Sequence, residues 1–114
     1  MAEAFFERIS GGPNAISAGI KPDYRVHSWT VELMKEVGID ISKRTPKLLT
    51  GKILEEADRI VAMDSDVLKQ IPPTYLLKAE NWNISPLLGK PKEEVRQIRD
   101  EINKKVQLLF REMA

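Results

Sequence analysis

Apolar residues along this chain recur at helical spacing in some stretches and form continuous runs in others. Intervals of three and four residues predict a helix over Ala2–Ile9, which the Gly-Gly-Pro sequence at residues 11–13 would stop. A second helix is predicted from Val26 to Gly38. The longest apolar stripe, Val95–Phe110, predicts a C-terminal helix that begins at Pro91.

Continuous apolar runs mark the predicted strands. Ile60–Met63 is uninterrupted, as expected of a strand buried on both faces, and Asn14–Ser17 and Tyr75–Ala79 are two further strand candidates. Short helices are predicted between them, one capped by Thr50 and one over Asp64–Gln70. Strands separated by helices predict an α/β fold with a parallel sheet flanked by helices on both faces.

The composition indicates one ordinary globular domain over residues 1–114. The 18 basic and 17 acidic residues are mixed along the chain, so the sequence indicates no basic patch that would bind nucleic acid. No apolar run approaches the roughly 20 residues that span a bilayer, and no basic segment followed by an apolar core opens the chain. We therefore expect a cytoplasmic protein with no nucleic-acid or membrane partner.

The chain contains no cysteine, which excludes disulfides, thiolate metal ligands and a thiol nucleophile within these residues. His27 is the sole histidine, so no pair of histidines can bind a metal. The acidic residues Asp58, Asp64 and Asp66 do not have the regular spacing of a calcium-binding loop. We expect neither a metal nor a cofactor.

Five short strings follow one another in a specific order: residues 2–6 (AEAFF), 17–19 (SAG), 38–42 (GIDIS), 57–64 (ADRIVAMD) and 98–102 (IRDEI). With these strings the chain resembles, over nearly its whole length, the low-molecular-weight protein tyrosine phosphatases and the arsenate reductases of the same fold. The resemblance implies an oxyanion enzyme whose cysteine thiolate attacks phosphorus in a phosphate-binding loop. Its partners would be phosphate or a similar oxyanion, a phosphorylated protein or a small phosphate ester.

The chain departs from this family pattern at both catalytic ends. By resemblance, Met1 falls just after the phosphate-binding loop, so the first, central strand and the loop's cysteine and arginine are expected to be missing. Ser85 falls at the general-acid position, and serine is no acid near neutral pH. No catalytic residue is identified, and the chain as given is predicted to be inactive. Ser17, Asp64 and Trp82 remain candidates for binding the oxyanion or shaping its loop.

Each candidate also has a purely structural interpretation. Ser17 would be a hydroxyl at a strand end, and Asp64 would cap the helix that follows it. Ser85, which precedes a proline, would form a turn. Trp82 would pack in the core.

Three functions remain open. Phosphatase activity is favoured over arsenate reduction, because the cysteines of thiol-coupled reductases would fall near Asp64 and Ile71, where there are none. The third is a non-catalytic binding module. The missing segment has two explanations: a start assigned at an internal methionine, which we favour, or a naturally short chain. Without the central strand, the strand edges near Ile16 and Val61 would be exposed. This predicts either a homodimer or a fold that rearranges around the gap left by that strand.

Overall fold

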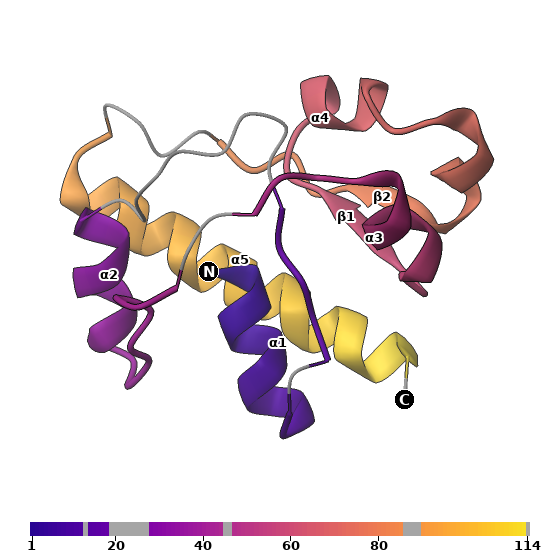
Figure 1. The fold of residues 1–114 in the computed structure, drawn as a ribbon. Helices are drawn as coiled ribbons and strands as arrows, with labels where there is room; N and C mark the ends of the chain where they lie inside the picture. Colours follow the sequence, from indigo (N-terminus) through magenta and orange to yellow (C-terminus); the bar gives the residue numbers. More distant parts are fainter. Residues whose placement is uncertain (13, 19–27, 45–46, 86–89, 114) are drawn as a thin grey trace.

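The computed structural model describes residues 1–12, 14–18, 28–44, 47–85 and 90–113 (Figure 1). Val26 and His27, which figured in the sequence predictions, lie outside the described residues. In chain order the elements are helix α1 (Ala2–Ser10), helix α2 (Ser28–Lys35), helix α3 (Gly51–Glu56), strand β1 (Ile60–Ala62), helix α4 (Ser65–Lys69), 3-10 helix η1 (Pro73–Lys78), strand β2 (Ala79–Asn81) and helix α5 (Lys92–Met113).

The sheet in the described part of the chain consists of β1 and β2, which run parallel with Ile60 opposite Ala79. The hydrogen-bonded ladder continues beyond both strands. The Trp82 N–H donates to the carbonyl of Ala62 at 2.9 Å, and the Ile84 N–H donates to the carbonyl of Met63 at 2.6 Å. The predicted parallel sheet is thus confirmed.

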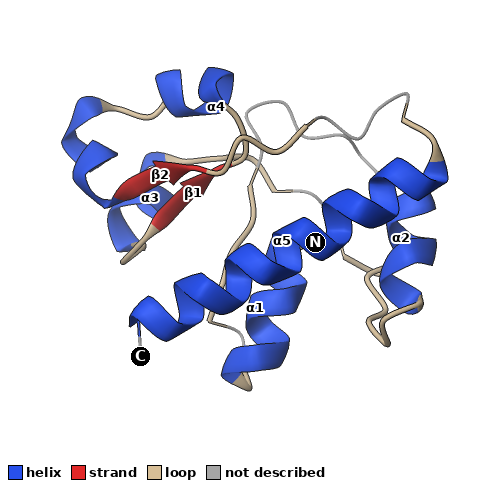
Figure 2. Ribbon diagram, turned by 180° about the vertical axis from the view of Figure 1, so that it is seen from behind, coloured by secondary structure: helices blue, strands red, loops and turns tan. Residues whose placement is uncertain are grey.

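Helices cover both faces of this sheet (Figure 2). Successive residues of a strand point to opposite faces. Ile60 and Ala62 accordingly pack with Leu54 of α3 and with Ile71 in one core, while Val61 packs against a second core built from α1, α2 and α5. The predicted α/β fold with helices on both faces is therefore confirmed, and its two cores meet at β1.

Helices α1 and α2 both pack against helix α5. Phe6 of α1 meets Phe110 of α5 edge to face, with 5.9 Å between the ring centroids. The apolar stripe that predicted α5 forms its buried face: Val95, Ile98, Ile102, Val106 and Leu109.

Within the described ranges, every helix is either too short or too polar to span a bilayer.

A buried arginine joins α5 to the end of α2. Arg99 is only 6% exposed, and its Nη1 donates to the carbonyl of Leu33 at 2.9 Å and to Glu36 Oε1 at 2.8 Å. Glu36 also accepts a hydrogen bond from Arg96 at 2.9 Å. Because every donor–acceptor pair here involves a charged group, these hydrogen bonds are of the stronger kind, and pairing makes the buried charge of Arg99 tolerable.

The helix that was predicted to end at Gly38 ends at Lys35, and Gly38 closes the turn that follows it. This glycine has φ of 83°, a conformation that costs other residues more because of their Cβ atoms. The Ile39 N–H donates to the carbonyl of Met34 at 3.0 Å, which closes the helix end in a Schellman arrangement.

Two predicted strands are wrong. Tyr75–Ala79 lies mostly in the 3-10 helix η1, and β2 begins only at Ala79. Pro73 at the first position of η1 suits a helical start, since its fixed φ and missing N–H are both tolerated there. Asn14–Ser17 belongs to no strand, because no other described strand pairs with it.

The Arg96 and Arg99 hydrogen bonds lower the pKa of Glu36 from its ordinary value to about 2. A carboxyl group with a lowered folded-state pKa stabilises the fold above its unfolded pKa and loses that contribution as pH falls through the folded value. We therefore predict that Glu36→Gln is less stable than the wild type at pH 7, and that the difference shrinks as the pH falls from about 4.5 towards about 2. Urea unfolding across this pH range measures it.

The matched control for this prediction is Glu94→Gln on α5, because Glu94 is exposed and forms no ion pair in the described part of the chain. It should leave the pH dependence unchanged. An equal effect of both substitutions would show that Glu36 contributes only through general surface charge.

Candidate functional site

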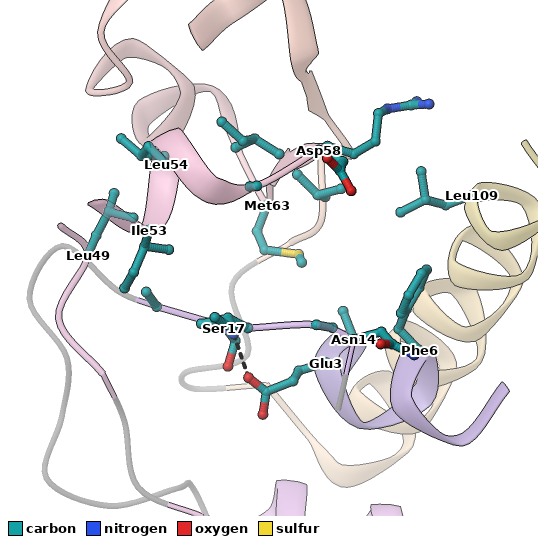
Figure 3. A pocket seen from close by; sticks show the side chains of 18 of the residues that line it. Glu3, Phe6, Asn14, Ser17, Leu49, Ile53, Leu54, Asp58, Met63 and Leu109 are labelled. Atoms are coloured by element: carbon teal, nitrogen blue, oxygen red, sulfur yellow. Dashed lines mark hydrogen bonds between the residues drawn. The ribbon is translucent and has the colours of Figure 1, made fainter. Parts of the chain in front are cut away.

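A cavity of about 570 Å³ lies between residues 14–18 and β1 (Figure 3). Its walls come from both cores of the molecule. On one side they include Phe6 of α1 and Leu109 of α5, and on the other Leu54 of α3 and Val67 of α4. The cavity is partly open to solvent, and it lies beside Ile16 and Val61, where the sequence predicted exposed edges.

The cavity meets β1 at its edge and not at one of its faces. Ile60 and Val61 both line it, although consecutive strand residues point to opposite faces of the sheet. The same is true of residues 14–18, all of which line the cavity. Two edges of backbone therefore border a largely apolar space.

One carboxylate organises the polar side of the cavity. Glu3 Oε2 accepts a hydrogen bond from the backbone N–H of Ser17 at 2.5 Å (Figure 3), and its Oε1 accepts one from Arg44 at 2.6 Å. Burial alone would raise the pKa of Glu3, but the hydrogen bonds from Ser17 and Arg44 outweigh burial and hold the pKa below its ordinary value. Arg44 also binds Glu7 at 2.7 Å, so it ties this part of α1 together.

The charged residues near the start of β1 are unequally paired. Arg59 binds Glu80 at 3.1 Å and Glu112 at 3.2 Å, so neighbouring carboxylates neutralise its charge. Asp58 and Glu56 also line the cavity. Glu56 meets Lys52 at only 4.0 Å, and Asp58 forms no ion pair with any described residue. Within the described ranges, no three histidine, cysteine, aspartate or glutamate side chains gather as metal ligands would.

The four candidate residues from the sequence do not gather in one place. Ser17 and Trp82 both line the large cavity, and Trp82 is 7% exposed within the core. Ser85 instead borders a separate cavity of about 270 Å³, together with Lys90 and residues of α5. Asp64 lines neither of these two cavities.

Asp64 has a local structural task at the end of β1. Its Oδ1 accepts a hydrogen bond from the Val67 N–H at 2.8 Å, which makes it the N-cap of α4. Thr50 caps α3 in the same way through the Ile53 N–H, at 3.3 Å.

Sequence reasoning missed Glu3 as a member of this site. Glu3 appeared only within the family string AEAFF, and nothing in its local pattern shows that it reaches Ser17 fourteen residues later. A hydroxyl interaction was expected at Ser17; its backbone N–H donates to Glu3, and its side-chain hydrogen bond also lowers the pKa of Glu3. The contact depends on tertiary structure, for which helical periodicity carries no signal.

The family model described as low molecular weight phosphotyrosine protein phosphatase matches residues 1–114. The chain belongs to this family. The resemblance inferred from the sequence is thereby confirmed.

Relatives in the family carry two different activities in their names. Arsenate reductase 2 of Staphylococcus epidermidis is 37% identical over 105 residues, which cover 90% of this chain and 79% of the relative. The low molecular weight protein tyrosine phosphatase of T. tengcongensis is 26% identical with a TM-score of 0.83, covering 97% of this chain and 88% of that one.

A third comparison shows the fold alone. The tyrosine phosphatase Wzb of Escherichia coli K30, solved in complex with sulphate, has a TM-score of 0.87 at 14% identity and covers 99% of this chain and 87% of that one. The family and the fold are therefore established, and they accommodate both phosphatases and arsenate reductases.

Loss of the Asp64 cap should destabilise the protein. Asp64→Ala removes the acceptor for the Val67 N–H, and we predict a fall of about 1 kcal/mol in the free energy of unfolding, within a range of about 0.5–2 kcal/mol. Urea denaturation measures it. Asp66→Ala, in the first turn of the same helix, is the matched control and should cost less. Equal losses would contradict the capping role.

Proposed function

We propose that residues 1–114 form the scaffold of an enzyme that hydrolyses phosphate monoesters such as phosphotyrosine. One observation carries the proposal: the family model matches the entire chain, and its description is that of a phosphotyrosine phosphatase. The sulphate held by the structurally similar Wzb supports an oxyanion as the ligand class, since sulphate and phosphate share tetrahedral geometry.

The substrate would bind beyond the carboxyl ends of the strands, where ligands bind in open α/β sheets. Asp64 follows the end of β1, and Ser85 lies after β2. Ser17 and Trp82, which line the large cavity, would shape the side of this region nearest to α1. In this arrangement Asp64 combines its capping contact with positioning of the substrate loop.

The reaction requires a group that these 114 residues do not contain. A cysteine thiolate attacks phosphorus, the ester P–O bond breaks, and the leaving oxygen takes a proton; water then hydrolyses the phosphocysteine and releases phosphate and the thiolate. The chain has no cysteine. We therefore propose that it is inactive by itself and that turnover depends on a cysteine from polypeptide outside these residues.

Arsenate reduction is the second candidate, and the name of the Staphylococcus epidermidis relative supports it. Reduction of arsenate to arsenite consumes two electrons, which thiols can supply by forming a disulfide. Hydrolysis requires a single thiolate and no net oxidation. Asp64 and Ile71 occupy the positions where the reductases' relay cysteines were expected. Hydrolysis would require only the nucleophilic cysteine in addition to this chain, whereas reduction would require the relay cysteines as well, so hydrolysis is the better supported reaction.

A non-catalytic module that binds an oxyanion or a partner is the remaining alternative, and a cytoplasmic location and a homodimer stay predictions. The first experiment is hydrolysis of p-nitrophenyl phosphate by residues 1–114 beside a form extended by the in-frame upstream codons. We predict that only the extended form turns over, and that iodoacetate stops it by alkylating the thiolate. A folded but inert extended form would favour the non-catalytic module, and turnover by residues 1–114 would contradict the thiolate mechanism.

The assignment of Ser85 to the general-acid position gives a sharper test in a cysteine-bearing form. We predict that Ser85→Asp raises kcat for phenyl phosphate, by up to the 10²–10⁴-fold that general acid catalysis typically contributes. The gain should be much smaller for p-nitrophenyl phosphate, whose leaving group needs little protonation. Ser85→Asn is the matched control without an acid. Equal rates for the aspartate and asparagine variants would remove Ser85 from this role.

A further inference from the structure

Asn83, two residues beyond β2, has a backbone conformation that is rare for a residue with a side chain. Among the residues that the structure describes, it is the sole non-glycine residue with a positive φ, at 52°. A Cβ atom disfavours this left-handed region, although asparagine tolerates it better than most residues. Residues held in this way gather at active sites and switch regions, where the surrounding structure keeps them in place.

Asn81, the last residue of β2, holds Asn83 in this conformation. The Asn83 N–H donates to Asn81 Oδ1 at 2.9 Å, and Asn81 Nδ2 donates to Asn83 Oδ1 at 3.0 Å. An asparagine side chain that binds the backbone two residues further on stabilises a turn. On either side of this turn, Trp82 and Ile84 are each 7% exposed in the core that α5 shares with α1 and α2. The turn is therefore anchored at both ends.

The pairing with β1 shifts by one residue at this turn. The Trp82 N–H donates to the carbonyl of Ala62. In a regular parallel ladder the next hydrogen bond would run from the Ile84 N–H to the carbonyl of Asp64, two residues further along. The Ile84 N–H instead donates to the carbonyl of Met63, at 2.6 Å. The segment after β2 thus contains one extra residue relative to its partner, which is a β-bulge.

The cause of this shift lies on the β1 side of the ladder. Asp64 already belongs to the start of α4, because its carbonyl accepts a hydrogen bond from the Leu68 N–H at 3.1 Å and its side chain accepts one from the Val67 N–H. The extra residue lets Ile84 pair with Met63 instead of losing its partner.

The bulge determines which way the residues after it face. A register shift of one residue moves side chains to the opposite face of a strand, and bulges beside active sites re-aim a side chain in this way. Ser85 follows Asn83 by two residues, and its exposed side chain borders the cavity of about 270 Å³ together with Gln97 and Ile98 of α5. Asn83 therefore sets the direction from which position 85 meets that cavity.

We propose that Asn83 is a positioning residue for position 85, and that its left-handed turn, held by Asn81, aims the side chain at position 85 towards the leaving oxygen of the substrate. The proposal rests on the proposed function, which assigns the general-acid position to Ser85. An acid must come within about 2.6–3.2 Å of the atom that it protonates. A misplacement of about 1 Å can cost about 10²-fold in rate, so the aim of this side chain controls what an acid here contributes.

Leaving-group kinetics test the proposal in the cysteine-bearing extended form that carries Ser85→Asp. Asn83→Val introduces a β-branched residue, which avoids positive φ, whereas Asn83→Gly accepts it readily. We expect Asn83→Val to lower kcat for phenyl phosphate by about tenfold or more, a part of the 10²–10⁴-fold that general acid catalysis typically contributes. The loss should be much smaller for p-nitrophenyl phosphate, and Asn83→Gly should keep both rates.

The matched background for these rates is Ser85→Asn, which has no acid to position. There Asn83→Val should not discriminate between the two esters. Equal losses for both esters in the Ser85→Asp form, or the same losses in both backgrounds, would mean that Asn83 acts only on stability and would overturn the proposal.

A second measurement follows the direction of position 85 in residues 1–114 without any turnover. Because the chain contains no cysteine, Ser85→Cys and Gln97→Cys introduce two thiols at the border of one cavity and no others are present. We expect a short bismaleimide to cross-link them severalfold faster when position 83 holds asparagine or glycine than in Asn83→Val. Equal rates in the three backgrounds would overturn the proposal.

Hydrogen exchange shows whether Asn83→Val disturbs only this turn. The Ile84 N–H should lose protection, because its bond to Met63 depends on the extra residue, while the Trp82 N–H keeps its own. If Trp82 also loses protection, Asn81→Ala replaces the variant, since it removes both side-chain contacts and leaves position 83 unchanged. The same selective losses are expected for it.

The two arms separate this proposal from the proposed function. If Ser85→Asp is no faster than Ser85→Asn while cross-linking still depends on Asn83, the general-acid assignment is wrong and the positioning of residue 85 stands. If Ser85→Asp raises the rate and Asn83 affects neither that gain nor the cross-linking, the positioning proposal is wrong and the proposed function stands.

Discussion

Burial of the apolar face of α5 is the interaction on which the other parts of the structure depend. Helices α1 and α2 both pack on this face, and α1 carries Glu3, which in turn holds residues 14–18 through Ser17. Leu109 belongs both to this face and to the wall of the large cavity. A change in the packing of α5 would therefore alter the wall of the candidate site directly, although β1 lines the opposite wall of the cavity.

The sequence predicted the elements whose pattern is long or chemically specific. The stripe of α5, the cap at Thr50 and the glycine turn at Gly38 all rest on local rules that the structure obeys. The α/β class followed from the continuous run at Ile60 and its neighbouring helices. These features need only a few residues of context, so a single sequence was enough.

The failures concern segments whose structure depends on distant partners. Tyr75–Ala79 contains residues that favour strands, yet the prolines before it and the register with β1 set the strand start at Ala79. No strand in the described part of the chain pairs with Asn14–Ser17, which is held instead by Glu3. In the candidate site, Ser17 and Trp82 line one cavity, whereas Asp64 and Ser85 lie elsewhere. Order along the chain could not show these distances.

The hydrogen bond between Glu3 and Ser17 has a consequence for the thermodynamics of association. Ordering a loop at an interface consumes part of the free energy that contacts release. Here Glu3 is itself fixed by Arg44, which also binds Glu7, so residues 14–18 are anchored before any ligand arrives. The entropy of arranging that segment is lost during folding, and a molecule that meets this edge encounters a preorganised surface.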